Sequence, residues 1–268
     1  MTPLRIGHSP DPDDAFMFFG FASHQVQIPG HPVVHVLEDI QTLNERAAGA
    51  DPLEVTALSL HAFLGLGGRY DWLEVGTSVG RGYGPRLVAR EHADVPSLAG
   101  RRVALPGRHT TATLVARGLL PAFEEVHVGF TEILPAVREG RVEAGVLIHE
   151  GQLTYADEGL VLLADLGELF ARRHGGLPLP LGVNCIRRDL APSLRAEVAD
   201  AYRRSVQVAL AQREAAVDYA LRFGRGIARD LADRFVGMYV NDDSLALGED
   251  LREAVELIRR DYACYATA

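Results

Sequence analysis

Strand-like and helix-like segments alternate along this 268-residue chain up to about residue 190. Such alternation is typical of α/β proteins, in which helices connect largely parallel strands. Short apolar segments predict strands at 3–7, 33–36, 54–58, 73–76, 84–90, 102–105, 126–129, 142–148, 160–163 and 181–187. Apolar residues at helical spacing predict helices at 14–21, 39–48, 59–66, 110–120, 131–138 and 166–173, followed by a tail that is almost all helix.

Two segments that lie far apart in the chain follow the same plan. Residues 42–63 and 132–153 each show an amphipathic helix, a glycine that stops it, a strand, and then a polar residue, Ser59 or His149. Any two βα units can look alike, which is one interpretation of this similarity. The other interpretation is a pair of similar α/β lobes that face each other.

Two further strand-like segments, 84–90 and 181–188, bracket the middle of the chain. If the chain leaves a first lobe at one and returns at the other, that lobe comprises residues 1–88 and 187–268. The second, inserted lobe then comprises residues 89–186. Because clefts between domains are favoured ligand sites, this organisation predicts a hinged protein that binds its ligand in the cleft.

Composition argues against several classes of protein. The 27 basic and 36 acidic residues give a net charge of −9, and no basic stripe with interleaved aromatic residues stands out, so we expect no nucleic-acid or membrane partner. The two cysteines, Cys185 and Cys264, lack metal-like spacing, which argues against a disulfide scaffold. No apolar run spans a bilayer, and the first apolar segment resembles a domain's first strand. We expect a cytoplasmic monomer or homodimer, unless a leader precedes this sequence.

Three acidic residues stand directly before the most apolar segment of the chain, in GHSPDPDDAFMFFG (residues 7–20). Asp11, Asp13 and Asp14 can cap the helix that follows, because their oxygens accept hydrogen bonds from free backbone N–H groups. The same loop follows a predicted strand, and loops at the carboxyl ends of strands in α/β proteins bind ligands. The loop therefore suits both a structural and a ligand-binding role.

A second candidate is the start of the helix predicted at 110–120. Arg108, His109, Thr110 and Thr111 follow a Pro-Gly turn there. Free N–H groups, hydroxyls and the helix dipole together form a suitable anion site. The alternative is an ordinary threonine N-cap.

His149 follows the apolar strand AGVLI, with Glu150 next. A histidine in this place can act as a base near neutral pH, although a structural hydrogen-bonding role is the alternative. Metal binding is disfavoured, because no second histidine lies two to four residues further on. Arg81, among the glycines of GTSVGRGYGP, can face a carboxylate or lie in a surface turn. No nucleotide-binding glycine motif is present, so a nucleotide cofactor is not supported.

Together these segments resemble the 1,4-dihydroxy-6-naphthoate synthase family of the futalosine route to menaquinone. The most specific are GRHTTA and the strand that ends in Ile-His-Glu. The resemblance covers nearly the whole chain, through LRIGHSPDPDDAFMF, VLEDIQTLNERA, GRGYGP, VALPGRHTTA, VEAGVLIHE, LTYADEGL, GLPLPLG and YVNDDSLALGE.

The resemblance implies a type-II periplasmic-binding-protein fold with two crossover hinge strands and a helical C-terminal tail. It implies a lyase without cofactor or metal that converts cyclic dehypoxanthine futalosine, a small carboxylated substrate, into 1,4-dihydroxy-6-naphthoate and a dihydroxyacetone fragment. His149 matches the family's proposed base. Candidate substrate-binding residues are Ser59, Thr110, Thr111, His109, Asp14, Arg81 and Asn44. A solute-binding module without catalysis and a sister enzyme of the chorismate dehydratase type are the alternatives.

The N-terminal loop departs from the family's usual pattern, Ser-Pro-Cys-Pro-Asn-Asp-Thr-Phe. Asp11, Asp13 and Ala15 replace the cysteine, asparagine and threonine. A carboxylate beside a carboxylated substrate repels it unless the carboxylate is paired or protonated. The state of these acids therefore bears on which substrate the site accepts.

Overall fold

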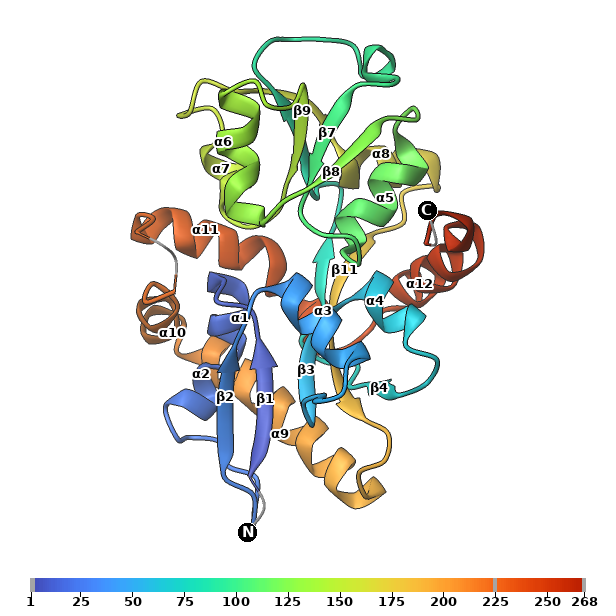
Figure 1. Cartoon of the computed structure of the whole chain (residues 1–268). Coiled ribbons are helices and arrows are strands. Elements are labelled where there is room, and N and C mark those ends of the chain that lie inside the picture. Colours follow the sequence, from blue (N-terminus) through green and yellow to red (C-terminus); the bar gives the residue numbers. More distant parts are fainter. Residues whose placement is uncertain (1–2, 224–225, 267–268) are drawn as a thin grey trace. The chain divides into compact units, whose positions relative to one another are not determined.

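The computed structural model describes residues 3–223 and 226–266 (Figure 1). The chain divides into two compact units. Unit 1 comprises Met1–Ser78 and Gly182–Gly248, and unit 2 comprises Val79–Leu181 and Glu249–Ala268.

The sheet of unit 1 combines parallel and antiparallel strands. Its order is β2 (Val33–Leu37), β1 (Leu4–His8), β3 (Val55–Ser59), β11 (Leu179–Arg187) and β4 (Tyr70–Trp72), with β5 (Ser78–Gly80) also paired to β11. β1 is parallel to both β2 and β3, whereas β11 is antiparallel to β3 and β4. The carboxyl ends of β2, β1 and β3 therefore meet at one edge of the sheet.

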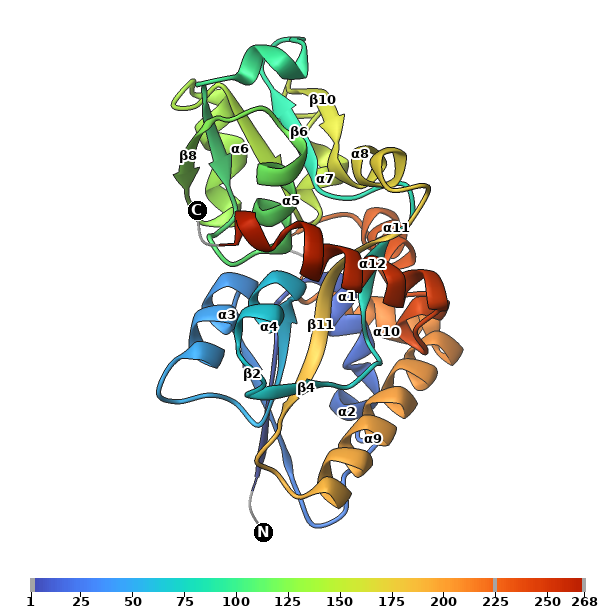
Figure 2. The same cartoon turned by 90° about the vertical axis from the view of Figure 1, so that its right-hand side faces the viewer.

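Helices cover both faces of this sheet. Figure 2 shows α3 and α4 on one face and α1, α2 and α9 on the other. The helices of unit 1 are α1 (Pro12–Met17), α2 (Phe19–Ala22), α3 (Ile40–Ala48), α4 (Leu60–Gly65), α9 (Pro192–Ala211), α10 (Arg213–Ala220) and α11 (Arg229–Tyr239), with a 3₁₀ turn at Asp242–Ser244.

The apolar N-terminal segment forms the centre of the core of unit 1. Phe16 and Phe18 are fully buried, and the ring of Phe18 lies 6.5 Å from that of Tyr202 on α9. Instead of one helix over 14–21, the segment forms α1 and α2. A side chain at Gly20 would lie 2.6 Å from the backbone of Ser205, so glycine permits this close approach of α2 to α9.

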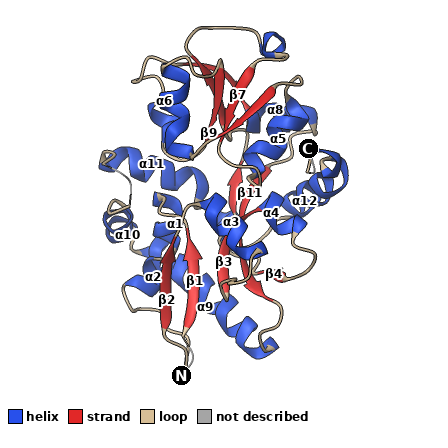
Figure 3. Cartoon of the chain, in the orientation of Figure 1, coloured by secondary structure: helices blue, strands red, loops and turns tan. Residues whose placement is uncertain are grey.

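The sheet of unit 2 has the order β10 (Val161–Asp165), β6 (Arg86–Ala89), β9 (Ala144–Leu147), β7 (Arg102–Leu105) and β8 (Glu124–His127). β7 is parallel to β8 and β9, whereas β6 is antiparallel to β9 and β10. Figure 3 shows α6 on one side of these strands and α5 and α8 on the other. The helices are α5 (Thr111–Leu119), α6 (Ile133–Arg138), α7 (Gly151–Thr154), α8 (Leu166–Arg173) and α12 (Glu249–Asp261), with 3₁₀ turns at Val95–Leu98, Phe130–Glu132 and Ala263–Tyr265.

The last helix, α12, belongs to unit 2, whereas the expected lobes assign all of residues 187–268 to the first lobe. The segment after α12 is fastened to α5: Arg117 Nη1 donates to the carbonyl of Tyr265 at 2.8 Å. A Cβ at Gly118 would lie 2.3 Å from the ring of Tyr262, so the glycine makes room for that ring. Helical spacing identifies a helix, but these contacts decide which unit it joins.

Two expected strands differ in place or role. Residues 73–76 are not a strand, and β4 lies at 70–72 instead, because Glu74 and Gly76 adopt left-handed φ values of 54° and 69°. Residues 84–90 contain β6, which lies inside the sheet of unit 2. By the bounds of the units, the chain passes between them within β5, within β11 and again between Gly248 and Glu249.

Candidate active site

At the carboxyl edge of the parallel strands in unit 1, Ser59 ends β3 and Asn44 projects from α3. The Asn44 amide donates to Ser59 Oγ at 3.0 Å, and its Oδ1 accepts from the Ser59 N–H at 2.9 Å. Both side chains are buried. This pair fixes Ser59, and the Ser59 hydroxyl keeps its own proton for another acceptor because it accepts from Asn44.

The acidic loop lies at the same edge, after β1. Ser9 binds two of its acids: the Ser9 hydroxyl donates to Asp11, and the Ser9 N–H donates to Asp14 Oδ2 at 3.1 Å. Asp11 is the N-cap residue of α1, but its side chain makes no capping hydrogen bond. The expected capping role is therefore replaced by a loop that folds back on itself.

Asp13 differs from an ordinary surface carboxyl group in its surroundings. It is buried, and the Ser78 hydroxyl lies 3.4 Å from its Oδ2. Burial, with the nearby carboxylates of Asp14 and Asp11, raises the pKa of Asp13 well above its usual value. The structure thus favours the neutral form of this carboxyl group.

In unit 2, Thr110 and Thr111 begin α5. Thr110 is its N-cap: the side-chain oxygen accepts from the Thr113 N–H at 3.2 Å, and the hydroxyl lies 3.0 Å from the Gly107 carbonyl. The Thr111 hydroxyl donates to the Leu181 carbonyl at 2.7 Å. Both hydroxyls therefore bind main-chain groups, and any anion at this helix would rely mainly on its N-terminal amides. His109, next to them, is exposed.

His149 follows β9 and has an unusual backbone conformation. Its φ is 67°, a left-handed value that is uncommon for residues other than glycine. Its side chain is buried, and its ring meets that of Phe130 edge-on, with centroids 4.1 Å apart. Such conformations persist where the surroundings enforce them and concentrate at functional sites.

Parallel pairing brings His149 and Thr110 to one edge of the sheet. β7 and β9 are neighbours, with Val103 opposite Ala144, so the loops that follow them emerge together. Phe130 reaches this edge from the loop after β8 and is a residue that sequence analysis missed. Its one sequence signal is its place directly after the strand expected at 126–129.

Arg81 is engaged elsewhere in unit 2. Its Nη1 lies 2.7 Å from Asp250 Oδ2 on α12, and both side chains are about 44% exposed. The neighbouring glycines serve close packing of the chain itself, since a Cβ at Gly84 would lie 2.9 Å from the N atom of Gly167. This ion pair places the Arg81 guanidinium beside α12.

A sequence profile for menaquinone biosynthesis matches residues 4–263. The chain belongs to this menaquinone biosynthesis family. Two relatives are 1,4-dihydroxy-6-naphthoate synthases. The protein from Thermus thermophilus is 43% identical over 95% of this chain and 92% of its own length. The protein from Streptomyces coelicolor is 39% identical over 92% and 88%, respectively.

Solved structures confirm the expected fold for this member of the menaquinone biosynthesis family. Protein AF1704 from Archaeoglobus fulgidus has a TM-score of 0.92 and 42% identity, with 99% of this chain and 98% of that chain covered. The periplasmic aliphatic sulphonate binding protein SsuA from Escherichia coli has a TM-score of 0.66 and 13% identity, with 97% and 93% covered. The second likeness shows the fold alone, which is the periplasmic-binding-protein fold.

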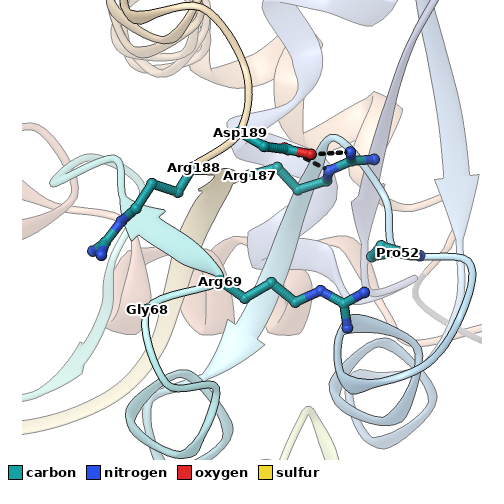
Figure 4. Close-up of a pocket in the computed structure, with 6 residues that line it drawn as sticks. All are labelled: Pro52, Gly68, Arg69, Arg187, Arg188 and Asp189. Atoms are coloured by element: carbon teal, nitrogen blue, oxygen red, sulfur yellow. Dashed lines mark hydrogen bonds and ion pairs between the residues drawn. The ribbon is translucent and has the colours of Figure 1, made fainter.

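Unit 1 also has a pocket of about 380 Å³ at the opposite end of β3 from Ser59 (Figure 4). Its arginines have structural partners: Arg187 Nε donates to Asp189 at 2.9 Å, and Arg69 donates to carbonyls at the end of α3. The pocket is lined by Pro52, Gly68, Arg69, Arg187, Arg188 and Asp189. It is therefore separate from the candidate residues at the carboxyl edge of this sheet.

The part of the chain that the structure describes comprises residues 3–223 and 226–266. In these ranges, no group of three or more His, Cys, Asp or Glu side chains is placed to hold a metal ion. None of the helices described there is both long and apolar enough to cross a membrane.

Proposed function

We propose that this protein is an enzyme of menaquinone biosynthesis: a lyase that cleaves cyclic dehypoxanthine futalosine to 1,4-dihydroxy-6-naphthoate and a dihydroxyacetone fragment. The observation that carries the proposal is its identity of 43% and 39%, over nearly all of the chain, to proteins named as synthases of that naphthoate. The reaction as proposed uses no cofactor and no metal.

In this proposal His149 is the general base. It takes a proton from the sugar-derived part of the substrate, and ring opening and aromatisation follow. Imidazole suits this role because it exchanges protons near neutral pH. The burial of His149, the edge-on contact with Phe130 and its left-handed backbone support a side chain held in one place for chemistry.

The substrate-binding groups in this proposal are the candidates expected from the sequence. Ser59 offers its hydroxyl proton, with Asn44 fixing its direction. The start of α5, at Thr110 and Thr111, offers main-chain N–H groups to the substrate carboxylate. His109, Asp14 and Arg81 are further candidates, of which Arg81 would have to leave Asp250 first.

The deciding experiment incubates the purified protein with cyclic dehypoxanthine futalosine and detects the naphthoate by mass spectrometry. We expect product with the wild type and a loss of about 100- to 10,000-fold in rate with His149→Asn. A parallel incubation with chorismate tests the sister activity. Tight binding of the futalosine derivative with no turnover would instead indicate a solute-binding module and would overturn the proposal.

A further inference from the structure

Arg86 in unit 2 occupies a place next to the strand that leads to His149. It is the first residue of β6 and stands directly opposite Leu147, the last residue of β9. His149 follows two residues later. The backbone of Arg86 therefore borders the approach to the candidate base.

The side chain of Arg86 reaches the chain on the other side of His149. Its Nη1 donates to the carbonyl oxygen of Gln152 at 2.6 Å. Gln152 lies in α7, three residues beyond His149, and is itself buried. Arg86 thus brackets His149: its backbone pairs with Leu147 and its guanidinium binds Gln152.

This turn needs support from outside. α7 has four residues, far fewer than a helix needs to be stable by itself. The carbonyls at the end of a helix lack partners within it, and a cation is favourable there. The left-handed backbone of His149 adds a conformational cost that the surroundings must offset. A charged hydrogen bond to Gln152 meets these requirements.

Arg86 is in turn held by its own neighbours. Its guanidinium carbon lies 5.6 Å from the centre of the Tyr155 ring. Its Nε lies 3.8 Å from Asp165 Oδ2, while Asp165 Oδ1 accepts from the Gly167 N–H at 2.9 Å as the cap of α8. The Arg86 side chain is 20% exposed. These contacts, with Tyr155 at the end of α7 and Asp165 at the end of β10, restrict its position.

We propose that Arg86 is a positioning residue that holds the turn carrying His149. Its cation ties α7 to the edge of β6 and so keeps the His149 backbone left-handed and its imidazole in place. Arg86 acts through this turn and has no assigned contact with substrate. The catalytic part of the inference rests on the proposed function, in which His149 is the base.

The test uses Arg86→Met, which keeps an unbranched apolar stem but removes the charge and the donors. Arg138→Met is the matched control, because Arg138 pairs with Glu158 at 2.7 Å on the exposed surface of the same unit. For each full-length variant we would measure kcat, KM, Tm and the imidazole NMR signals of His149. Those signals are assigned by their absence in His149→Asn.

We expect Arg86→Met to shift the His149 signals and to lower kcat by about 10- to 100-fold with little change in KM, because a displaced base slows the chemical step. Arg86→Lys keeps a cation and a donor for Gln152, so it should recover part of kcat and of the NMR position. Arg138→Met should match the wild type in all four measurements.

Unmoved His149 signals and unchanged kcat in folded Arg86→Met would overturn the inference, even if Tm falls, because that pattern describes support for the fold alone. If Arg86→Met does not fold, Arg86→Lys decides by the same two readouts, with wild-type values counting against the inference. Shifted His149 signals together with an active His149→Asn enzyme would support the positioning role but contradict the proposed base.

Discussion

In both units, polar residues stand at or just after the carboxyl ends of parallel strands. The two units hold these residues in different ways. In unit 1, Ser59 has an extended backbone, with φ of −63° and ψ of 142°, and two hydrogen bonds with Asn44 hold it in place. In unit 2, His149 is left-handed, with φ of 67°, and a four-residue helix follows it. We interpret the relaxed edge of unit 1 as suited to recognition and the strained edge of unit 2 as suited to chemistry.

Replacing His149 by Asn tests the role of unit 2, and we expect it to have the largest effect of these substitutions. Asparagine keeps a polar side chain and tolerates a left-handed backbone, but it cannot act as a base near pH 7. We expect single-turnover rates to fall by about 100- to 10,000-fold, with Tm and substrate affinity close to wild type. A folded variant with near wild-type turnover would remove His149 from the mechanism.

Replacing Asn44 by Ala tests whether its hydrogen bonds hold Ser59 in place in unit 1. The buried N–H and hydroxyl of Ser59 would lose their partner, and an unsatisfied buried polar group costs about 1–3 kcal/mol. We expect a loss of that size in the free energy of unfolding by urea, together with weaker substrate binding. Gln41→Ala on the same helix is the control, with an expected change within about 0.5 kcal/mol. Equal losses of stability and of substrate binding in the two variants would contradict a specific role of Asn44 in holding Ser59.

Replacing Thr110 by Val tests whether α5 contributes hydroxyls or amides to binding. The structure uses the Thr110 oxygen as the N-cap, so Val should cost about 1 kcal/mol of stability. Substrate affinity should change little in folded protein, because the helix amides remain. Thr110→Ser keeps the cap and should match the wild type in urea unfolding. A large affinity loss in Thr110→Val at unchanged stability would instead assign the hydroxyl to the substrate.

The effect of Asp13→Asn on stability should be smallest near pH 4 and should grow as the pH rises above it. Because burial raises the pKa of Asp13 in the folded state, that state binds its proton more tightly than the unfolded state does. The wild type therefore loses stability as the pH rises from the ordinary carboxyl value toward the folded-state pKa, whereas Asn has no proton to lose. Measured against pH, the Tm of the variant should rise relative to the Tm of the wild type as the pH increases. Parallel curves would contradict a neutral Asp13.

Much of the candidate site was predictable from sequence because its signals are local. Cap chemistry and strand ends identified Thr110 as the start of a helix and His149 as the residue after a strand. The pairing of Asn44 with Ser59 was not predictable, since it joins two elements across 15 positions of the chain. Phe130 and Arg86 carry no motif, and contacts between separate elements are what connect them to the His149 turn.

The sequence by itself determined the α/β class, most of the strands and helices, and the membership of the menaquinone biosynthesis family, because apolar periodicity and short motifs are properties of neighbouring residues. Only the tertiary structure decided that β4 lies at 70–72, that α12 joins unit 2, and that His149 takes a left-handed backbone. Each of these depends on packing between segments far apart in the chain. The contact of Arg117 with Tyr265 ties the segment after α12 to α5, and we propose that the contact of Arg86 with Gln152 supports the His149 turn. No local pattern encodes such contacts.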